Sequence, residues 1–314
     1  MNEMAISASG LRKAYQDKVV LDGVDVGVRA GSVFSLLGPN GAGKTTTVNI
    51  LSTLLKADGG TARVAGFDIA SETRAVRAAI GVTGQFASVD DLLTGEENLR
   101  LMADLQHLGA REGKRVVGEL LERFDLVESA RKMASTYSGG MRRKLDLAMT
   151  LVGRPRIVFL DEPTTGLDPR SRRTMWNIVR ELVAEGMTIF LTTQYLEEAD
   201  QLADRVAVLD QGKVVAEGTP DELKRQVPGS HVRLRFGQVA QLEAAARVLT
   251  GSTAEPESLS LRVPSDGGVR SVRFVLDRLD EYAIEVEEFS VHTPDLDDVF
   301  LALTGHSSTE VVAK

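Results

Sequence analysis

The chain has 314 residues, of which 43% are hydrophobic and 26% charged, a balance typical of a folded globular protein and a length that predicts two domains. A formal net charge of −8 disfavours nucleic acid as a partner, because a broadly acidic surface repels phosphates. The chain has no cysteine, which excludes disulfide bonds and thiolate metal sites.

The first predicted element that carries chemistry is a buried strand at 33–37, which leads into a glycine-rich turn. Apolar residues at helical spacing then predict a helix over 45–55. The turn matches the pattern G-x-x-x-x-G-K-[ST], in which backbone N–H groups and the helix N-terminus hold phosphates. The sequence therefore predicts a nucleoside triphosphate site, with Lys44 on the β- and γ-phosphates and the Thr45 hydroxyl on Mg²⁺. Its residues are Gly38, Pro39, Asn40, Gly41, Ala42, Gly43, Lys44, Thr45 and Thr46.

A helical region is predicted next. Residues 96–124 carry apolar side chains at helical intervals, which indicates a helical subdomain of about 86–152 inserted into the α/β body. Thr94 and Glu97 fit a capping box at its start. Ser138 opens a further helix, and its hydroxyl together with the free helix N–H groups makes an anion site. In isolation, that pattern is more typical of an ordinary capped helix.

Two further buried strands are predicted at 157–160 and 188–191. The first ends in Asp161 and Glu162, of which Asp161 is suited to hold Mg²⁺ and Glu162 to polarise the attacking water. Taken alone, such a pair is as often a turn or a helix cap, but the glycine-rich turn in the same chain favours the catalytic interpretation. Strands that alternate with helices predict an α/β fold with a largely parallel sheet.

The pattern changes near the C-terminal third of the chain. Proline- and glycine-rich sequence at 218–230 predicts a junction between a first domain, 1–228, and a small C-terminal α+β domain, 229–305. Residues 306–314 are predicted to form a frayed tail.

Within the second domain, alternating apolar residues predict strands near 232–236 and 259–263, and a helical stripe covers 272–279. The last helix is predicted to start with Thr293 as its N-cap, followed by Pro294 at the first helical position. The acidic residues that come next would then occupy its first turn, where the helix dipole favours them.

The order of three motifs resembles that of the ATP-binding-cassette (ABC) ATPases: the glycine-rich turn, the signature-like turn that opens at Tyr137-Ser138, and the pair Asp161-Glu162. The resemblance covers about 4–220 and implies a P-loop core of mostly parallel sheet, with an antiparallel β region and the inserted helical subdomain. It also implies an aromatic residue stacked on adenine, a glutamine that senses Mg²⁺ and the transport partner, and an aspartate loop near the nucleotide. The site residues that it adds are Tyr15, Gln85, Ser138, Gly139, Gly140 and Asp168, with Gln85 also in the metal shell.

Two residues depart from the common pattern of that family. Gln194 stands where most members have the switch histidine, and its amide can hydrogen-bond the γ-phosphate but cannot carry a positive charge. Met141 stands where the signature usually has glutamine. Both departures, together with the segments at 95–99 and 297–305, resemble the subgroup of daunorubicin/doxorubicin-resistance ATP-binding subunits. The catalytic residues that this resemblance implies are Glu162, Gln194 and Lys44.

The subgroup implies an ATPase that uses ATP and Mg²⁺ to energise export of a hydrophobic drug-like compound, with anthracycline-type antibiotics among the candidates. The implied partners are a separate transmembrane permease subunit and a second copy of the chain, arranged head to tail so that 138–140 of one copy closes the site of the other. The chain is expected as a peripheral protein at the cytoplasmic face of the membrane. Two other functions stay open: a soluble ABC ATPase that acts on ribosomes or DNA, and a regulatory module that binds ATP without turnover.

The other polar residues are interpreted as structural. The four histidines lie far apart and lack metal-ligand spacing. Two basic clusters are interpreted as solvated helix faces, one formed by Arg142, Arg143 and Lys144 and the other by Arg172 and Arg173.

Overall fold

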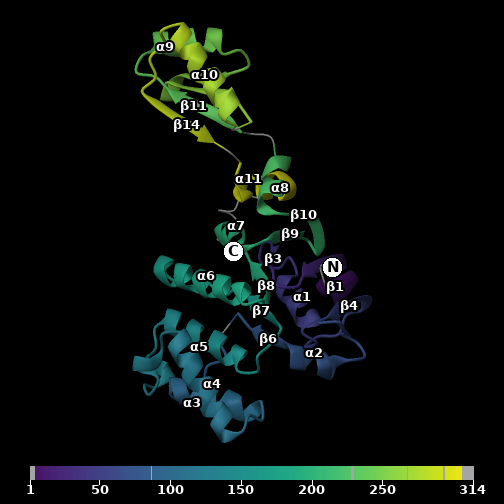
Figure 1. Cartoon of the computed structure of the whole chain (residues 1–314). Helices are drawn as coiled ribbons and strands as arrows, with labels where there is room; N and C mark the ends of the chain where they lie inside the picture. The colour runs from purple at the N-terminus through teal and green to yellow at the C-terminus, as the bar shows by residue number, and fades with distance from the viewer. Residues whose placement is uncertain (1–3, 86, 228–229, 267, 293, 306–314) are drawn as a thin grey trace. The chain divides into compact units, whose positions relative to one another are not determined.

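The computed structural model of the chain describes residues 4–85, 87–227, 230–266, 268–292 and 294–305. These residues form two compact units, 4–220 and 221–305, which are described separately (Figure 1). Four features of the sequence-based prediction lie outside the described residues: the junction at 228–229, residue 86, the helix cap Thr293 and the tail at 306–314.

The first unit contains a four-stranded antiparallel sheet made of β1 (Met4–Tyr15), β2 (Lys18–Arg29), β4 (Gly59–Val64) and β5 (Phe67–Asp68). The strands lie in the order β2-β1-β4-β5. Side chains on one face are fully buried, among them Leu11, Leu21 and Val24. This alternation of buried and exposed residues is typical of an antiparallel sheet with one face on the core.

A six-stranded sheet forms the centre of the first unit. Its strands are β3 (Val33–Leu37), β6 (Ile80–Thr83), β7 (Ile157–Asp161), β8 (Thr188–Thr193), β9 (Arg205–Asp210) and β10 (Lys213–Gly218). They lie in the order β10-β9-β3-β8-β7-β6, and all neighbours are parallel except β10 and β9. Every residue of β3, β7 and β8 is buried, which explains their continuous apolar runs, because both faces of a parallel sheet are covered.

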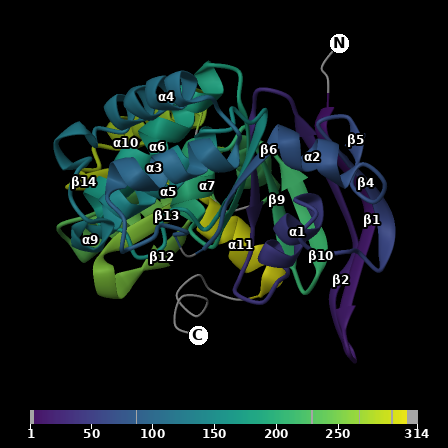
Figure 2. The same ribbon diagram turned by 90° about the horizontal axis from the view of Figure 1, so that it is seen from below.

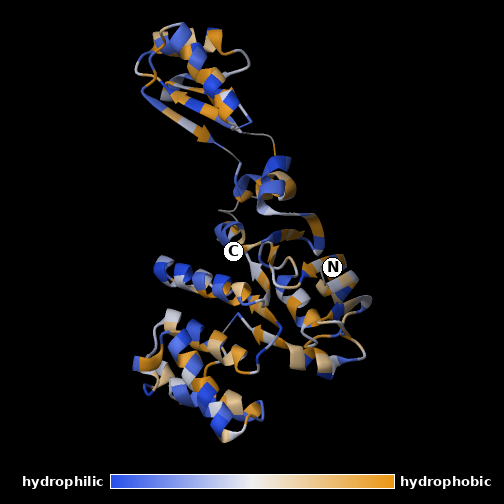
Figure 3. Cartoon of the chain, in the orientation of Figure 1, coloured by the Kyte–Doolittle hydropathy of each residue, from blue (hydrophilic) through white to orange (hydrophobic). Residues whose placement is uncertain are grey.

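Two apolar clusters cover the two faces of this sheet. Phe34 and Phe159 point to one face, where the antiparallel sheet, α1 (Lys44–Leu51) and α2 (Thr73–Ala79) pack. Val158 and Leu191 point to the other face, where α6 (Pro169–Ala184) and the end of α7 (Leu196–Leu202) pack. Figure 2 shows α1 and α2 beside the antiparallel strands and α3 to α6 gathered on the other side. Figure 3 shows apolar residues concentrated on the central strands, whereas the helices alternate between apolar and polar.

A group of helices is inserted between β6 and β7. It consists of α3 (Gly95–Leu105), α4 (Ala110–Arg123) and α5 (Gly139–Leu151), with the short 3-10 helices η1 (Val127–Ser129) and η2 (Ala134–Thr136). The predicted capping box is confirmed, since Thr94 Oγ1 accepts the Glu97 N–H at 3.2 Å and Glu97 Oε2 accepts the Thr94 N–H at 2.8 Å. Among the described residues, no helix is both long and apolar enough to cross a membrane.

The helix predicted over 45–55 is shorter than expected. It ends at Leu51, with Ser52 as its C-cap. Thr53 has a φ of +62°, a left-handed conformation that ends the helix because it breaks the regular hydrogen-bond ladder. The apolar residue at 55 that suggested a longer helix packs against the same core from outside the helix.

The second unit is a small α+β fold. Its antiparallel sheet contains β11 (His231–Arg235), β12 (Thr253–Glu255), β13 (Ser260–Pro264) and β14 (Glu288–His292) in the order β12-β13-β11-β14. Its helices are α8 (Pro220–Gln226), α9 (Val239–Val248), η3 (Pro256–Ser258), α10 (Val269–Glu281) and α11 (Leu296–Thr304). A separate apolar core that includes Val232, Leu234 and Phe236 holds the sheet against α9 and α10.

The predicted start of the last helix is wrong. The helix begins at Leu296, and its N-cap is Asp295, whose carboxylate accepts the Asp298 N–H at 3.0 Å. Asp298 Oδ2 in turn accepts the Asp295 N–H at 3.1 Å. This reciprocal capping box favours a helix start at Leu296 over an earlier one, because it satisfies two N–H groups at the start of the helix. Acidic residues do occupy that turn, as expected.

Candidate nucleotide site

The predicted site residues follow three neighbouring strands. β8 lies between β3 and β7, and all three are parallel. The turn at 38–46, named the phosphate loop here, follows β3, Gln194 follows β8, and Asp161 ends β7. Because the carboxyl ends of parallel strands share one edge of the sheet, segments more than a hundred residues apart in sequence meet there.

Glycines give the phosphate loop its shape. Gly38 approaches the adjoining strand so closely that a Cβ at this position would lie 2.3 Å from the Leu209 carbonyl oxygen. Gly43, the N-cap of α1, has a φ of +112°, which a residue with a Cβ rarely adopts. The loop can therefore turn sharply into α1, whose first N–H groups have no acceptor within the helix and are suited to an anion.

Lys44 is buried inside this loop. Its Nζ donates to the carbonyl oxygens of Gly38 and Pro39 at 2.8 and 3.1 Å and lies 3.2 Å from Glu162 Oε1. Burial lowers the pKa of Lys44, and the Glu162 carboxylate opposes that shift. Lys44 and Glu162 are 5% and 7% exposed, respectively. The charged pair lies at the edge of the sheet where the phosphates are expected.

Asp161 holds two hydroxyl groups. Its Oδ2 accepts the Thr45 hydroxyl at 2.8 Å, and its Oδ1 accepts the Thr192 hydroxyl. Carboxylate and hydroxyl oxygens are ligands that Mg²⁺ prefers. No group of three or more His, Asp or Glu side chains suited to a metal occurs in the described part of the chain. The Thr45 hydroxyl and the Asp161 carboxylate fit Mg²⁺, which takes few protein ligands and completes its shell with water and phosphate oxygens.

Glu162 has an unusual backbone conformation. Its φ is +48°, a left-handed value that is costly for a residue other than glycine and is often found at functional sites. The surroundings fix it: its N–H donates to the carbonyl oxygen of Thr192 at 3.1 Å, and its Oε2 accepts the Thr165 hydroxyl at 3.3 Å. The carboxylate is consequently oriented toward Lys44.

Gln194 follows the strand that is hydrogen-bonded to β3. The carbonyl oxygen of Thr193, just before it, accepts the Gly38 N–H at 3.2 Å. The side-chain Oε1 of Gln194 is buried and has no hydrogen-bond partner among the described residues. A buried acceptor without a donor is unfavourable, so Gln194 is ready to accept a hydrogen bond at this edge.

Among the described residues, no hydrogen bond joins Tyr15 or Gln85 to the phosphate loop. Tyr15 is 49% exposed, and Lys13 Nζ lies 5.6 Å from the centroid of its ring. Gln85 is exposed, and no hydrogen bond of its side chain is found within the described ranges. Both residues are exposed, so their side chains can meet a ligand.

The signature turn, residues 138–140, packs within its own chain against the start of α6. Ser138 is the N-cap of α5, and its hydroxyl accepts the Met141 N–H at 3.3 Å. A Cβ on Gly140 would lie 2.6 Å from Ser171 Oγ. Asp168 caps α6 by accepting the N–H groups of residues 170 and 171, and the Ser171 side chain lowers its pKa. Among the described residues, no hydrogen bond joins the signature turn to the phosphate loop.

The interpretation of Arg143 as a solvated residue is wrong. Only 6% of it is exposed, because its guanidinium is enclosed by carbonyl groups and by Asp146. Its neighbours do lie near the surface: Arg142 pairs with Asp91 and Lys144 with Asp125. Asp146 carries the signal that could have revealed the pair, since it interrupts an apolar run on α5 three residues after an arginine.

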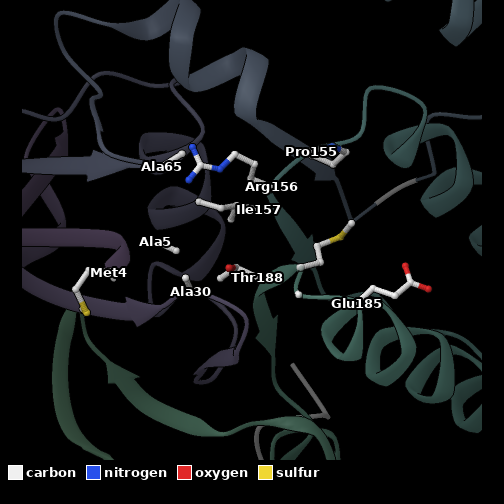
Figure 4. A pocket seen from close by; sticks show the side chains of 11 residues that line it. Met4, Ala5, Ala30, Ala65, Pro155, Arg156, Ile157, Glu185 and Thr188 are labelled. Carbon is white, nitrogen blue, oxygen red and sulfur yellow. The ribbon is translucent and has the colours of Figure 1, made fainter. Parts of the chain in front are cut away.

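A pocket of about 290 Å³ lies elsewhere on the first unit. Figure 4 shows Ile157 and Thr188 in its wall, with Arg156 and Glu185 nearby. Ile157 and Thr188 are the first residues of β7 and β8, so the pocket lies at the amino edge of the sheet, opposite the phosphate loop. It contains none of the predicted site residues.

Comparisons with known proteins agree with this geometry. The family described as ABC transporter matches residues 21–165. A daunorubicin resistance ATP-binding protein of Streptomyces coeruleorubidus is 50% identical over 97% of each chain. The daunorubicin/doxorubicin resistance ATP-binding protein of Streptomyces peucetius is 48% identical over 98% of this chain and 94% of its own. A solved structure of an ATP-binding subunit of an ABC transporter is 30% identical, with a TM-score of 0.64 over 71% of this chain and 92% of that chain.

The predicted fold class and family are both confirmed. The solved neighbours are subunits of ABC transporters with the same mixed α/β architecture, and the similarity to the resistance proteins extends through the second unit. The chain therefore belongs to the ABC transporter family, as an ATP-binding and ATP-hydrolysing subunit of the daunorubicin/doxorubicin-resistance group.

Proposed function

We propose that the chain energises the export of a hydrophobic drug-like compound, with anthracycline-type antibiotics as the leading candidates, through a separate membrane permease. The proposal is supported by relatives named for daunorubicin and doxorubicin resistance, which match nearly the whole chain. In this role the protein is peripheral and binds the cytoplasmic face of the permease.

The proposed position of the nucleotide is at the carboxyl edge of the six-stranded sheet. The triphosphate lies in the phosphate loop with Lys44 on its β- and γ-phosphates, and the exposed ring of Tyr15 stacks on adenine. Thr45 and Asp161, whose oxygens are 2.8 Å apart, hold Mg²⁺, and Gln85 completes the protein's part of that shell. When bound, Mg²⁺ neutralises charge on the phosphate oxygens.

Glu162 is the proposed group that orients the attacking water. The observation that carries this role is the buried pair of Glu162 Oε1 and Lys44 Nζ, 3.2 Å apart. A γ-phosphate would compete for Lys44 and release the carboxylate, which could then accept a proton from water. Gln194 contributes its unpartnered Oε1, which can accept a hydrogen bond from the same water.

A second copy of the chain is proposed to complete each site. The signature turn packs on residues 167–171 of its own chain, and its N–H groups belong to a helix N-terminus suited to an anion. In a head-to-tail dimer, Ser138 of one copy closes over the γ-phosphate held by the other. Asp168 lies beside that turn and would approach the same nucleotide.

The dimer proposal is tested by complementation. Ser138→Ala and Glu162→Gln are each expected to abolish most turnover. In a heterodimer, one site receives an intact Glu162 from the first chain and an intact Ser138 from the second, whereas the other site has both defects. Co-expressed chains with different tags, purified through both tags, should therefore recover about half of the wild-type rate of phosphate release. No recovery above the single variants would refute the shared site.

Export is tested in cells. Co-expression of the chain with its adjacent membrane subunit should lower the steady-state accumulation of daunorubicin, measured by its fluorescence, and Lys44→Ala should abolish the effect because phosphate binding is lost. Accumulation that does not differ between the two would rule out this cargo. The same assay with other fluorescent hydrophobic compounds measures which compounds the transporter exports.

The second unit is proposed to mediate contacts between copies or to regulate the permease. The support is its separate apolar core, which lets it fold as a compact unit. A chain truncated after Pro220 should still bind ATP but should self-associate more weakly in analytical ultracentrifugation. Unchanged association and unchanged export would contradict this role.

A further inference from the structure

Arg143 lies in the second turn of α5 and joins three segments of the first unit. Its Nε donates to the carbonyl oxygen of Pro163 at 2.8 Å, and its Nη2 donates to that of Asp161 at 3.1 Å. Its Nη1 donates to the carbonyl oxygen of Gly84 at 2.8 Å and lies 3.3 Å from Asp146 Oδ2. The guanidinium belongs to α5, the helix that begins at the signature turn. It is hydrogen-bonded both to the end of β7 and to the segment after β6.

The two carbonyl groups on the β7 side flank Glu162. Glu162 keeps its left-handed conformation, with a φ of +48°, only because its neighbours fix the backbone. On one side Thr192 accepts its N–H, and on the other Arg143 holds the carbonyl groups of residues 161 and 163. The direction of the Glu162 carboxylate therefore depends on a side chain of α5.

Asp146 extends the connection to the segment that contains Gln85. Its Oδ1 accepts the N–H of Ser88 at 2.8 Å, while Arg143 holds the carbonyl of Gly84 on the other side of Gln85. Asp146 is 3% exposed. The Gln85 loop, a name used here for residues 84, 85, 87 and 88, is consequently held at Gly84 and at Ser88 by one charged pair on α5.

Stability alone does not explain this pair. Burial lowers the pKa of Arg143 and raises the pKa of Asp146, which means that the loss of solvent disfavours the charged form of each. Buried ion pairs can often be replaced by well-packed apolar residues without loss of stability. Apolar residues could not reproduce the fork of donors that joins the Gln85 loop to the backbone beside Glu162.

We propose that Arg143, held by Asp146, is a positioning residue that couples the Gln85 loop to Glu162. The inference rests on the roles proposed above for Gln85 and Glu162. When a nucleotide or the permease displaces the Gln85 loop, the guanidinium moves with it because its donors are shared between the two segments. The backbone at Glu162 then follows, and the signature turn moves with α5.

The first test separates positioning from binding. Arg143→Met combined with Asp146→Leu removes both charges and keeps similar volumes, so the fold should survive. We expect an ATP dissociation constant within about 2-fold of wild type and a kcat at least about 10-fold lower, because Glu162 loses its orientation while the phosphate loop is untouched. Arg143→Lys keeps the ion pair but lacks the fork of donors, so its kcat should lie between those of wild type and the double variant. The matched control Arg115→Met, whose ion pairs on α4 are exposed, should keep the wild-type kcat.

The second test measures the coupling itself. The chain has no cysteine, so Ser88→Cys places a single thiol on the Gln85 loop at an exposed position. ATP with Mg²⁺ should change the rate at which this thiol reacts with a disulfide reagent several-fold in the otherwise native chain. The change should disappear when Arg143→Met and Asp146→Leu are added.

Three results would overturn the inference. The first is an unchanged kcat in the double variant, and the second is an ATP-dependent thiol reactivity that survives it. The third is a joint loss of ATP affinity, thermal stability and kcat, which would assign the pair a purely structural role. The proposed function is tested separately. Full turnover of the Glu162→Gln variant would exclude the proposed role of Glu162, whatever the result for the double variant.

Discussion

Replacement of Glu162 by glutamine tests the charged pair at the centre of the nucleotide site. Glu162 Oε1 and Lys44 Nζ are 3.2 Å apart, which corresponds to an attraction of about 5 kcal/mol at an effective dielectric constant of about 20. The amide oxygen of glutamine can still accept a hydrogen bond from the ammonium group, which retains about 2 kcal/mol of that attraction. The net destabilisation of the chain without nucleotide is then about 3 kcal/mol.

Two measurable consequences follow from this estimate. Without ATP, the variant should unfold about 6 to 12 °C below wild type in a thermal-shift assay. With ATP and Mg²⁺ the difference should shrink, because the phosphates supply the negative charge that Lys44 has lost. Steady-state phosphate release should fall by about 10² to 10³, since an amide cannot take a proton from water.

The control for this experiment is Glu122→Gln, an exposed position on α4. It removes the same charge from the chain and should leave both the unfolding temperature and the rate unchanged. The reasoning is refuted if Glu162→Gln has the same ATP-induced rise in unfolding temperature as wild type, because Lys44 would then not exchange the carboxylate for phosphate. Full turnover would refute the catalytic role of Glu162.

Three further predictions concern single residues. Gln194→Ala should lower phosphate release less than Glu162→Gln, because its amide does not titrate near neutral pH, and an equal loss in both would contradict this. Gly43→Ala should weaken the binding of a fluorescent ATP analogue at least about 10-fold, since alanine is strained at the φ of +112°, and a normal affinity would show that the loop adapts. The bonds from Thr94 lower the pKa of Glu97 from 4.5, so Glu97 adds stability that is present above pH 4.5 and is lost as the pH falls through the lower folded pKa. Glu97→Gln keeps a cap that does not titrate, and its unfolding temperature should therefore fall less on acidification; an equal fall would exclude the carboxylate as the cause.

The sequence predicts the location of the site better than its internal contacts. Buried apolar runs that end in glycine or acidic residues indicate parallel strands, and such strands end at a common edge. Lys44 and Asp161 could be assigned to that edge on this basis, whereas the role of Gln194 follows only from the resemblance to the ABC ATPases. The pairing of Lys44 with Glu162 could not be predicted, because it depends on the left-handed backbone of Glu162, which no local pattern of residue types encodes.

Arg143 shows where the helical pattern misleads. Polar residues on a helix are usually solvated, and the two basic neighbours of Arg143 do lie near the surface. The carbonyl groups that enclose it come from segments 18 to 59 residues away in sequence, so its burial is a consequence of tertiary packing. The start of the last helix was missed for a different reason, since two adjacent capping signals competed and the reciprocal bonds of Asp295 prevailed.

The strand order also has a consequence for synthesis of the protein. β8 is made after β3 and β7 but lies between them, so a nascent chain that has not passed Thr193 cannot bring Lys44 next to Glu162. Until then, β3 and β7 each present an unpaired edge, which exposes the apolar strands to aggregation or to chaperones. The phosphate loop after β3 and the acidic pair at the end of β7 are therefore brought to one edge of the sheet only once β8 has been made.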